Sequence, residues 1–216
     1  MSDPQRLPQA EITELELGYM RLSDAAPLIM AKDAGLFARY GLDVSLHREV
    51  SWANLRDKLV VGKLDAAQLL APLPMMTNLG AGGIRGSLMT GLALGLNGNA
   101  ITLRLPVLPP EQMCDSLARG VIDGFCVGEP WNTVAVEQGI GTVAASGYHL
   151  WNNAPEKVLG VTEQWHQSHP ATHLRLRLAI MEACKLLTEL DAREHIAEVM
   201  SQKCYLDLPK RLLLPS

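Results

Sequence analysis

A short unit of this sequence occurs twice in approximately the same form. The segment that begins at Asp57 reads DKLVVGKLDAAQLLAP, and the segment that begins at Asp115 reads DSLARGVIDGFCVGEP. In each copy an amphipathic helical pattern ends at a glycine suited to a left-handed helix cap, and a short apolar run follows. The repeat therefore predicts two related lobes, each with a helix that leads into a buried strand. The positions that coincide in register are Asp57/Asp115, Leu59/Leu117, Gly62/Gly120, Asp65/Asp123 and Pro72/Pro130.

The residues around the first copy predict alternating strands and helices. Residues 15–20 and 42–47 have the character of strands, and Ser23 or Asp24 can cap a helix that lies between them. Ser51 can cap a second helix, which leads into the strand of the first copy at residues 66–70. Strands that alternate with helices are typical of a parallel α/β sheet. We therefore expect an α/β fold.

The second copy has less chain in front of it than the first. Only residues 100–108 precede it, which is room for one strand, so we expect a second lobe that is small or has lost several dozen residues. Further strands are predicted at residues 141–146 and 156–161, and a long helix begins at Pro170. The expected organisation is a polar N-terminal tail (1–14), lobe 1 (15–97), an incomplete lobe 2 (98–170) and C-terminal helices that partly return to lobe 1 (171–216).

Charge and hydrophobicity exclude several classes of protein. The formal net charge is −4, and no run of Lys or Arg occurs, so we expect no direct nucleic-acid partner. No apolar window is long enough for a membrane span. The first residues, MSDPQRLPQAEITELELG, lack the pattern of an export leader. As written, the sequence predicts a cytoplasmic protein, or a periplasmic one if a leader precedes it.

Signals for metals and catalysis are poor. The four cysteines are far apart and form no C-x-x-C motif, so we expect reduced, mostly buried thiols: Cys114, Cys126, Cys184 and Cys204. His166, His169 and His173 resemble a metal cluster, but Pro170 interrupts the helix that would align them, and surface or capping roles are the better interpretation. Neither G-x-S-x-G nor H-E-x-x-H occurs. The chain is therefore predicted to be a binding protein without a cofactor, not an enzyme.

Four residues have the chemistry to bind a small anion. Trp52 lies at a helix N-terminus, Asn99 in a turn and Lys157 in a short strand, and Gly128 opens the segment GEPWN. Pro fits a first helical turn, and the free N–H groups of that turn can receive an anion. An indole N–H, an amide and one positive charge suit a small monoanion. From spacing alone, the better interpretation of each residue singly is structural: a core aromatic, a turn former, a backbone requirement and a surface charge.

A family resemblance gives these four residues a shared role. The sequence resembles the solute-binding proteins for nitrate, nitrite and bicarbonate, which belong to the nitrate/sulfonate/taurine class of ABC transporter components. The resemblance implies a type II periplasmic-binding-protein fold, with two α/β lobes and the ligand in the cleft between them. It also implies that Trp52, Asn99, Gly128 and Lys157 hold the oxyanion. The segments that carry it are SDAAPLIMAKDAGLFARYGLDVSLHRE, SWANLRDKL, LDAAQLLAPLPM, LGLNGNAITL, GFCVGEPWN and PEKVLGVTEQWHQSHP.

The chain departs from the family in two places. Family members carry a further part of the second lobe, which includes a histidine of the anion site. In this chain that part is absent, and LRLP at residues 103–106 joins the flanking segments directly. The C-terminal portion is also short.

Several functional alternatives stay open. One is a cytoplasmic nitrate sensor that holds an RNA-binding antiterminator, and another is the binding component that feeds an ABC permease. A non-binding remnant is a third. An enzyme of pyrimidine biosynthesis is a fourth, but no motif for that chemistry is present. The donors do not distinguish nitrate, nitrite and bicarbonate.

Overall fold

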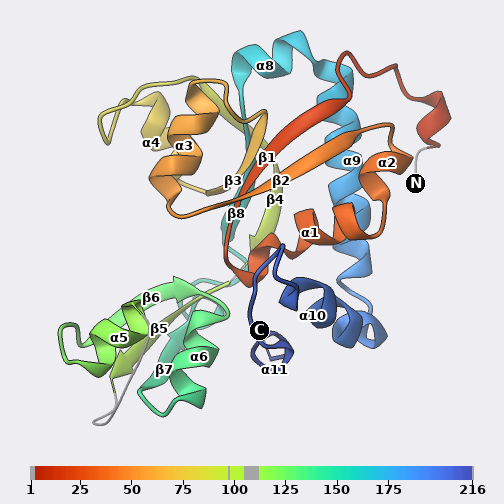
Figure 1. Cartoon of the computed structure of the whole chain (residues 1–216). Coiled ribbons are helices and arrows are strands. Elements are labelled where there is room, and N and C mark those ends of the chain that lie inside the picture. Colours follow the sequence, from red (N-terminus) through yellow and green to blue (C-terminus); the bar gives the residue numbers. More distant parts are fainter. Residues whose placement is uncertain (1–2, 97, 105–111, 216) are drawn as a thin grey trace.

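The strands of the computed structural model, which describes residues 3–96, 98–104 and 112–215, form two separate sheets (Figure 1). The larger sheet has the strand order β2-β1-β3-β8-β4, and the smaller has the order β6-β5-β7. This confirms the predicted α/β class with two lobes. The larger sheet contains β1 (Glu14–Met20), β2 (Asp43–Glu49), β3 (Ala66–Leu70), β4 (Leu88–Leu96) and β8 (Pro155–Thr162). The smaller sheet contains β5 (Asn99–Arg104), β6 (Gly124–Gly128) and β7 (Gly141–Ser146).

The position of β8 differs from the expected division of the chain. We expected this strand in the second lobe, but it lies between β3 and β4 and is antiparallel to both. Its side chains explain the position, because Val158, Leu159 and Val161 are buried and a central strand needs apolar side chains on both faces. The expectation of a parallel sheet is thus wrong for β8 and for the whole smaller sheet, and holds for the pairs of β1 with β2 and β3.

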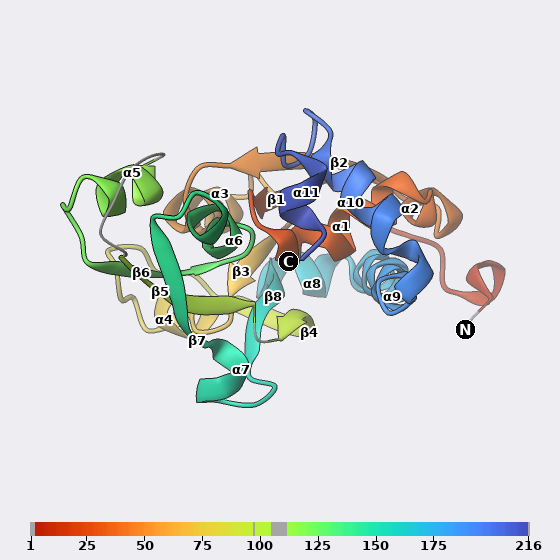
Figure 2. The same cartoon turned by 90° about the horizontal axis from the view of Figure 1, so that it is seen from below.

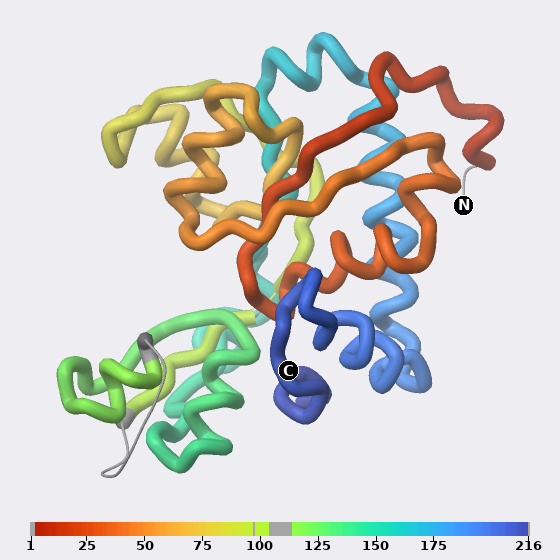
Figure 3. The backbone as a smooth tube through the Cα atoms, in the orientation of Figure 1, coloured from red at the N-terminus to blue at the C-terminus, as the bar shows by residue number. Residues whose placement is uncertain are grey.

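Helices cover both faces of the larger sheet (Figures 1 and 2). One face carries α1 (Ala26–Asp33), α2 (Leu36–Arg39), α9 (Pro170–Leu186) and α10 (Arg193–Ser201), whose apolar side chains share a core with β1 and β2. The other face carries α3 (Trp52–Val60) and α4 (Leu73–Asn78), which pack with β3 and Val158. The chain passes to the smaller sheet after β4 and returns before β8 (Figure 3).

The two copies of the repeat fold in the same way at their helix ends. Gly62 ends α3 with φ +72°, and Gly120 follows α5 (Gln112–Ala118) with φ +71°. Their hydrogen bonds also correspond, because Lys63 N donates to Lys58 O and Val121 N to Ser116 O, each at 2.8 Å. The predicted helix–glycine–strand unit is confirmed twice. The copies differ in the sheets that their strands join, and the expected buried strand is confirmed for β3 but wrong for β6, an edge strand that is mostly half-buried.

The smaller lobe is built around one short helix. α6 (Trp131–Glu137) packs against β5, β6 and β7, and α7 (Gly147–Leu150) follows β7. Val134, Ala135, Ile140 and Cys114 form its core. Asn99, which we expected in a turn, is the first residue of β5. Residue 97, at the end of the expected lobe 1, and residues 105–108 of the strand expected before the second copy lie outside the described residues.

The last helix touches both lobes. α11 (Lys210–Leu213) lies between α10 and α6 in Figures 1 and 2. Leu212 joins the core of the smaller lobe, and its neighbour Leu213 joins the larger core. Arg211 adds an ion pair with Glu137 of α6 (3.3 Å).

The N-terminal residues form contacts that a polar tail would not make. The Glu11 carboxylate accepts hydrogen bonds from the backbone N–H groups of Ala171 (3.0 Å) and Thr172 (2.8 Å), at the start of α9. Burial opposes ionisation of Glu11, but these N–H donors outweigh it and lower its pKa to about 2. Leu7 and Ile12 pack against the larger core.

Two side-chain expectations were wrong in part. Cys114 is buried and Cys184 partly so, but Cys126 and Cys204 are exposed, so only some of the thiols are buried. His173 is not a surface residue, because α9 places it against α8 (Glu163–Ser168) and it is only 2% exposed. Within the described ranges, no helix is long and apolar enough to cross a membrane.

Replacing Gly18 with alanine is expected to destabilise the larger lobe by about 1–3 kcal/mol, the usual cost of overpacking. A Cβ at this position in β1 would lie 2.4 Å from Leu55 Cδ2 and 2.6 Å from Leu64 Cδ1, and both leucines are buried. Chemical denaturation measures the change. In a Leu55→Ala background the same substitution should cost less, and an equal cost would contradict the packing explanation.

Candidate functional site

Lys157 of β8 is a fully buried cation at the end of the larger sheet nearest the smaller lobe. Its Nζ lies 2.8 Å from Asp24 Oδ2 and 3.7 Å from Glu156 Oε2. A buried ammonium is costly unless opposite charges surround it, so the two carboxylates account for its burial. Lys157 is therefore not the solvated surface charge that its spacing alone favoured.

The structure brings the four predicted site residues together around this ammonium. Lys157 Nζ lies 5.9 Å from the centroid of the Trp52 ring and 3.4 Å from Asn99 Oδ1. Asn99 pairs with Gly128 across β5 and β6, and a Cβ on Gly128 would lie 3.3 Å from Asn99 Oδ1. Trp52 and Lys157 belong to the larger lobe, and Asn99 and Gly128 to the smaller. The four residues thus meet at the junction of the lobes, while their role in binding stays a prediction.

Sequence reasoning missed Asp24 as a member of this cluster. We expected a helix-capping role, but its side chain makes no capping hydrogen bond. Instead Asp24 Oδ1 accepts a hydrogen bond from Gln68 Nε2 (2.6 Å), and Gln68 Oε1 accepts one from Met20 N (2.8 Å). Burial raises the pKa of the Asp24 carboxyl, against the opposing effect of the Lys157 charge. One signal was available, because Asp24 follows the carboxyl end of β1, where ligands of open α/β sheets bind.

Two N–H groups at the GEPWN turn, where the sequence predicted an anion site, are already bound within the chain. Glu129 Oε2 accepts hydrogen bonds from Thr133 N (3.1 Å) and Thr133 Oγ1 (2.9 Å), so a carboxylate of the chain itself caps α6. Glu129 N donates to Gly98 O (3.2 Å). Such partners satisfy donors that an anion would otherwise need. The prediction was wrong for these two N–H groups.

The same turn holds the two lobes together beside Lys157. Glu129 O accepts a hydrogen bond from Ser23 N (2.7 Å), and Trp131 Nε1 donates to Arg21 O (3.3 Å). The Arg21 guanidinium lies 5.6 Å from the centroid of the Trp131 ring, which is a cation–π distance. These contacts close the junction, and they would have to adjust if a ligand entered between the lobes.

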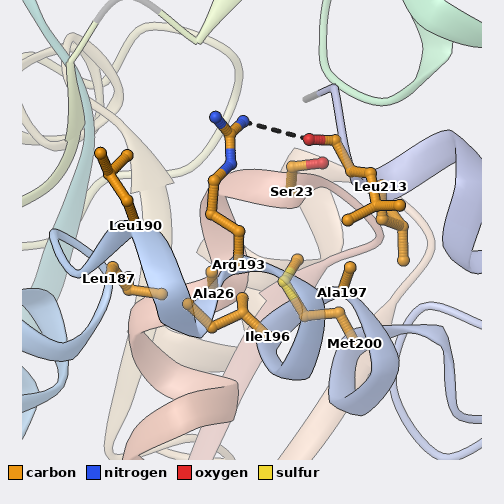
Figure 4. A pocket seen from close by; sticks show the side chains of 10 residues that line it. Ser23, Ala26, Leu187, Leu190, Arg193, Ile196, Ala197, Met200 and Leu213 are labelled. Atoms are coloured by element: carbon orange, nitrogen blue, oxygen red, sulfur yellow. Dashed lines mark hydrogen bonds between the residues drawn. The ribbon is translucent and has the colours of Figure 1, made fainter.

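A pocket of about 280 Å³ lies beside the junction, between α1, α10 and α11 (Figure 4). Its walls are mostly apolar, with Ala26, Ile196 and Met200 among them, and its one charged wall residue is Arg193. Arg193 Nη2 donates to Leu214 O (3.1 Å). None of the four predicted site residues lines this pocket. In the part of the chain that the structure describes, no group of His, Cys, Asp and Glu side chains is arranged to hold a metal ion.

Solved structures show which class of protein has this two-lobed fold. The crystal structure of the periplasmic nitrate-binding protein NrtA from Synechocystis PCC 6803 superposes with a TM-score of 0.89 and 27% identity, over 96% of this chain and 70% of that one. The alkanesulfonate-binding protein SsuA from Xanthomonas axonopodis pv. citri shares the fold, with a TM-score of 0.72 and 16% identity over 95% and 83% of the two chains. The fold is that of periplasmic binding proteins, and the expected class with a reduced lobe is confirmed.

Sequence comparison gives the family. The NMT1-like family matches residues 8–107 and 103–201, and the chain belongs to it, together with solute-binding proteins for nitrate and bicarbonate. The nitrate import ATP-binding protein NrtC of Synechocystis sp. is 36% identical over 93% of this chain and 38% of its own length. The nitrate/nitrite binding protein NrtA of Synechocystis sp. is 28% identical over 92% and 59%. The chain thus spans about 40–60% of these curated relatives. The names of these relatives are those of transport and binding proteins.

Proposed function

We propose that this chain binds a small oxyanion, nitrate or nitrite, at the lobe junction formed by Trp52, Asn99, Gly128 and Lys157. The observation that carries the proposal is the buried Lys157 ammonium, which residues of both lobes surround. A cation, an aromatic ring and an amide in one dry place are the groups that recognise a flat monoanion. Relatives whose names are nitrate/nitrite binding protein and bicarbonate-binding protein support the same class of ligand.

Calorimetric titration of the chain with nitrate, nitrite, hydrogencarbonate and chloride tests this proposal. Nitrate or nitrite is expected to bind, and Asn99→Ala is expected to weaken binding about 10-fold to 100-fold, since a hydrogen bond to a charged group contributes about 1.5–3 kcal/mol. Trp52→Phe is expected to weaken it as well. Trp151→Phe is the matched control, because Trp151 is 77% exposed and outside the cluster. An absence of heat with nitrate and nitrite, together with binding of an aliphatic sulfonate, would reject this ligand.

Two settings for this binding are open. The first is a substrate-binding component that delivers nitrate, bicarbonate or a sulfonate to an ABC permease, and relatives named nitrate import and bicarbonate transport ATP-binding proteins support a transport setting. The second is a cytoplasmic sensor, with an RNA-binding antiterminator as its partner.

Pull-down with nitrate present and absent distinguishes the two settings. A sensor is expected to release its partner when nitrate closes the lobes, whereas a transport component is expected to bind its permease more strongly in the closed form. A chain that binds neither an oxyanion nor a partner would be the non-binding remnant.

A further inference from the structure

The charges around Lys157 do not balance for a protein that is to receive an anion. The Lys157 ammonium already faces two carboxylates, Asp24 at 2.8 Å and Glu156 at 3.7 Å. With both carboxylates ionised, the cluster carries a net charge of about −1 before any ligand arrives. A monoanion beside Lys157 would make it −2 in a place from which water is excluded, where like charges repel strongly.

We propose, as an extension of the proposed function, that Asp24 takes up one proton when a monoanion binds, and that the protonated Asp24 then donates a hydrogen bond to the anion. The uptake restores the charge of the cluster to −1. It also changes Asp24 Oδ2 from an acceptor, which repels an oxyanion, into a donor beside Lys157 Nζ. Asp24 thereby determines which anions the site accepts and at what pH.

The geometry favours Asp24 Oδ2 as the atom that is protonated. Asp24 Oδ1 is engaged by Gln68 Nε2 (2.6 Å), whereas Oδ2 has no hydrogen-bond partner beyond its ion pair with Lys157 among the described residues. Oδ2 also faces the smaller lobe, because a Cβ on Gly128 would lie 3.4 Å from it. An anion held between Lys157 and Gly128 would therefore lie next to this oxygen.

The neighbouring charged groups leave Asp24 as the best proton acceptor. On β8 these groups are Lys157, which is the ion-pair partner of Asp24, and Glu156. The Glu156 carboxylate lies farther from Lys157 Nζ than the Asp24 carboxylate does, and its side chain is 18% accessible against 9% for Asp24. On the smaller lobe the GEPWN turn carries the carboxylate of Glu129, which accepts hydrogen bonds from Thr133. The groups from β3, β4 and β5 are Gln68, Gly95 and Asn99, which do not titrate. Burial raises the pKa of Asp24, in the same sense.

Titration calorimetry with nitrate at pH 6, 7 and 8, in two buffers of different ionisation enthalpy, tests the proposal. The buffers should be cationic, such as bis-tris and imidazole, because sulfonate buffers are themselves oxyanions. We expect an uptake of about one proton per nitrate bound and an apparent Kd that rises about tenfold per pH unit, as one linked proton requires. Hydrogencarbonate carries its own proton, so at pH 8 it is expected to bind without uptake.

Two isosteric variants identify the acceptor. Asp24→Asn keeps an oxygen for Gln68 and supplies an N–H donor, so nitrate binding is expected to lose both its proton uptake and its pH dependence. Glu156→Gln is the matched control and should retain both. Binding of nitrate without proton uptake overturns the inference about Asp24 but leaves the proposed function in place. Uptake that survives in Asp24→Asn and disappears in Glu156→Gln has the same meaning. If neither the unsubstituted chain nor Asp24→Asn binds any oxyanion at any pH, the proposed function fails first.

Discussion

Replacement of Lys157 by methionine is expected to lower the free energy of unfolding by about 3–5 kcal/mol, the cost of leaving a buried charge without its partner. Methionine fills a similar volume but leaves Asp24 and Glu156 facing each other without a cation. Chemical denaturation at pH 7 measures the loss. Because burial raises the pKa of the Asp24 carboxyl, this group takes up a proton in acid, and the difference between the two proteins should shrink as the pH falls toward 5.

A double variant separates charge from packing. Lys157→Met combined with Asp24→Asn removes one of the two unpaired charges, so the combined change should cost less than the sum of the single changes. Lys185→Met is the surface control, since Lys185 is exposed on α9 and should change stability by no more than about 0.5 kcal/mol. Additive losses in the double variant would show that Lys157 contributes through packing and not through its charge.

Acid is expected to destabilise the packing of α8 on α9 through His173. His173 Nδ1 lies 2.9 Å from His166 Nδ1, and the His173 ring packs against Trp165. Burial, followed by the charges of Arg177 and His166, lowers the pKa of His173 to about 4. In the unfolded chain His173 takes up a proton near pH 6.5, whereas in the folded chain it does so only near pH 4. The folded state therefore loses stability as the pH falls through this interval. The expected loss is about 3 kcal/mol.

The variant His173→Asn tests this assignment. Asparagine can keep a hydrogen bond to His166 but does not titrate. Denaturation curves between pH 7 and pH 4 should therefore show a stability slope smaller by about one proton in the variant. The carboxyl of Glu11, with a pKa of about 2, contributes to acid sensitivity mainly below this interval. An unchanged slope between pH 6.5 and 4 in the variant would assign the acid sensitivity to other groups.

The predictable part of the fold is the part that short-range signals determine. Ser51 accepts a hydrogen bond from Asn54 N (3.1 Å) at the start of α3, and Thr162 accepts one from Trp165 N (3.1 Å), as their capping patterns predict. The glycines at 62 and 120 end their helices with positive φ. The position of β8 in the sheet could not be predicted from such local signals, because β8 pairs with strands that lie far away in the sequence.

The sequence predicted four residues of the cluster around Lys157 but not the electrostatics of that cluster. Trp52, Asn99, Gly128 and Lys157 were identified from the family resemblance, and each alone has an ordinary structural explanation. Their convergence follows from the two sheets meeting at one edge. The part that Asp24 plays depends on burial and on the distance to Lys157, neither of which a sequence pattern contains. The burial of His173 was missed because it depends on how α8 folds back on α9.

Leu212 and Leu213 are consecutive residues, yet each is anchored in a different hydrophobic core. Any rotation that separates the two halves must pull one of these anchors out or carry the last helix along with it. Helix α11 therefore limits how far the two lobes can move apart. An affinity tag fused directly after this helix would disturb the same contacts.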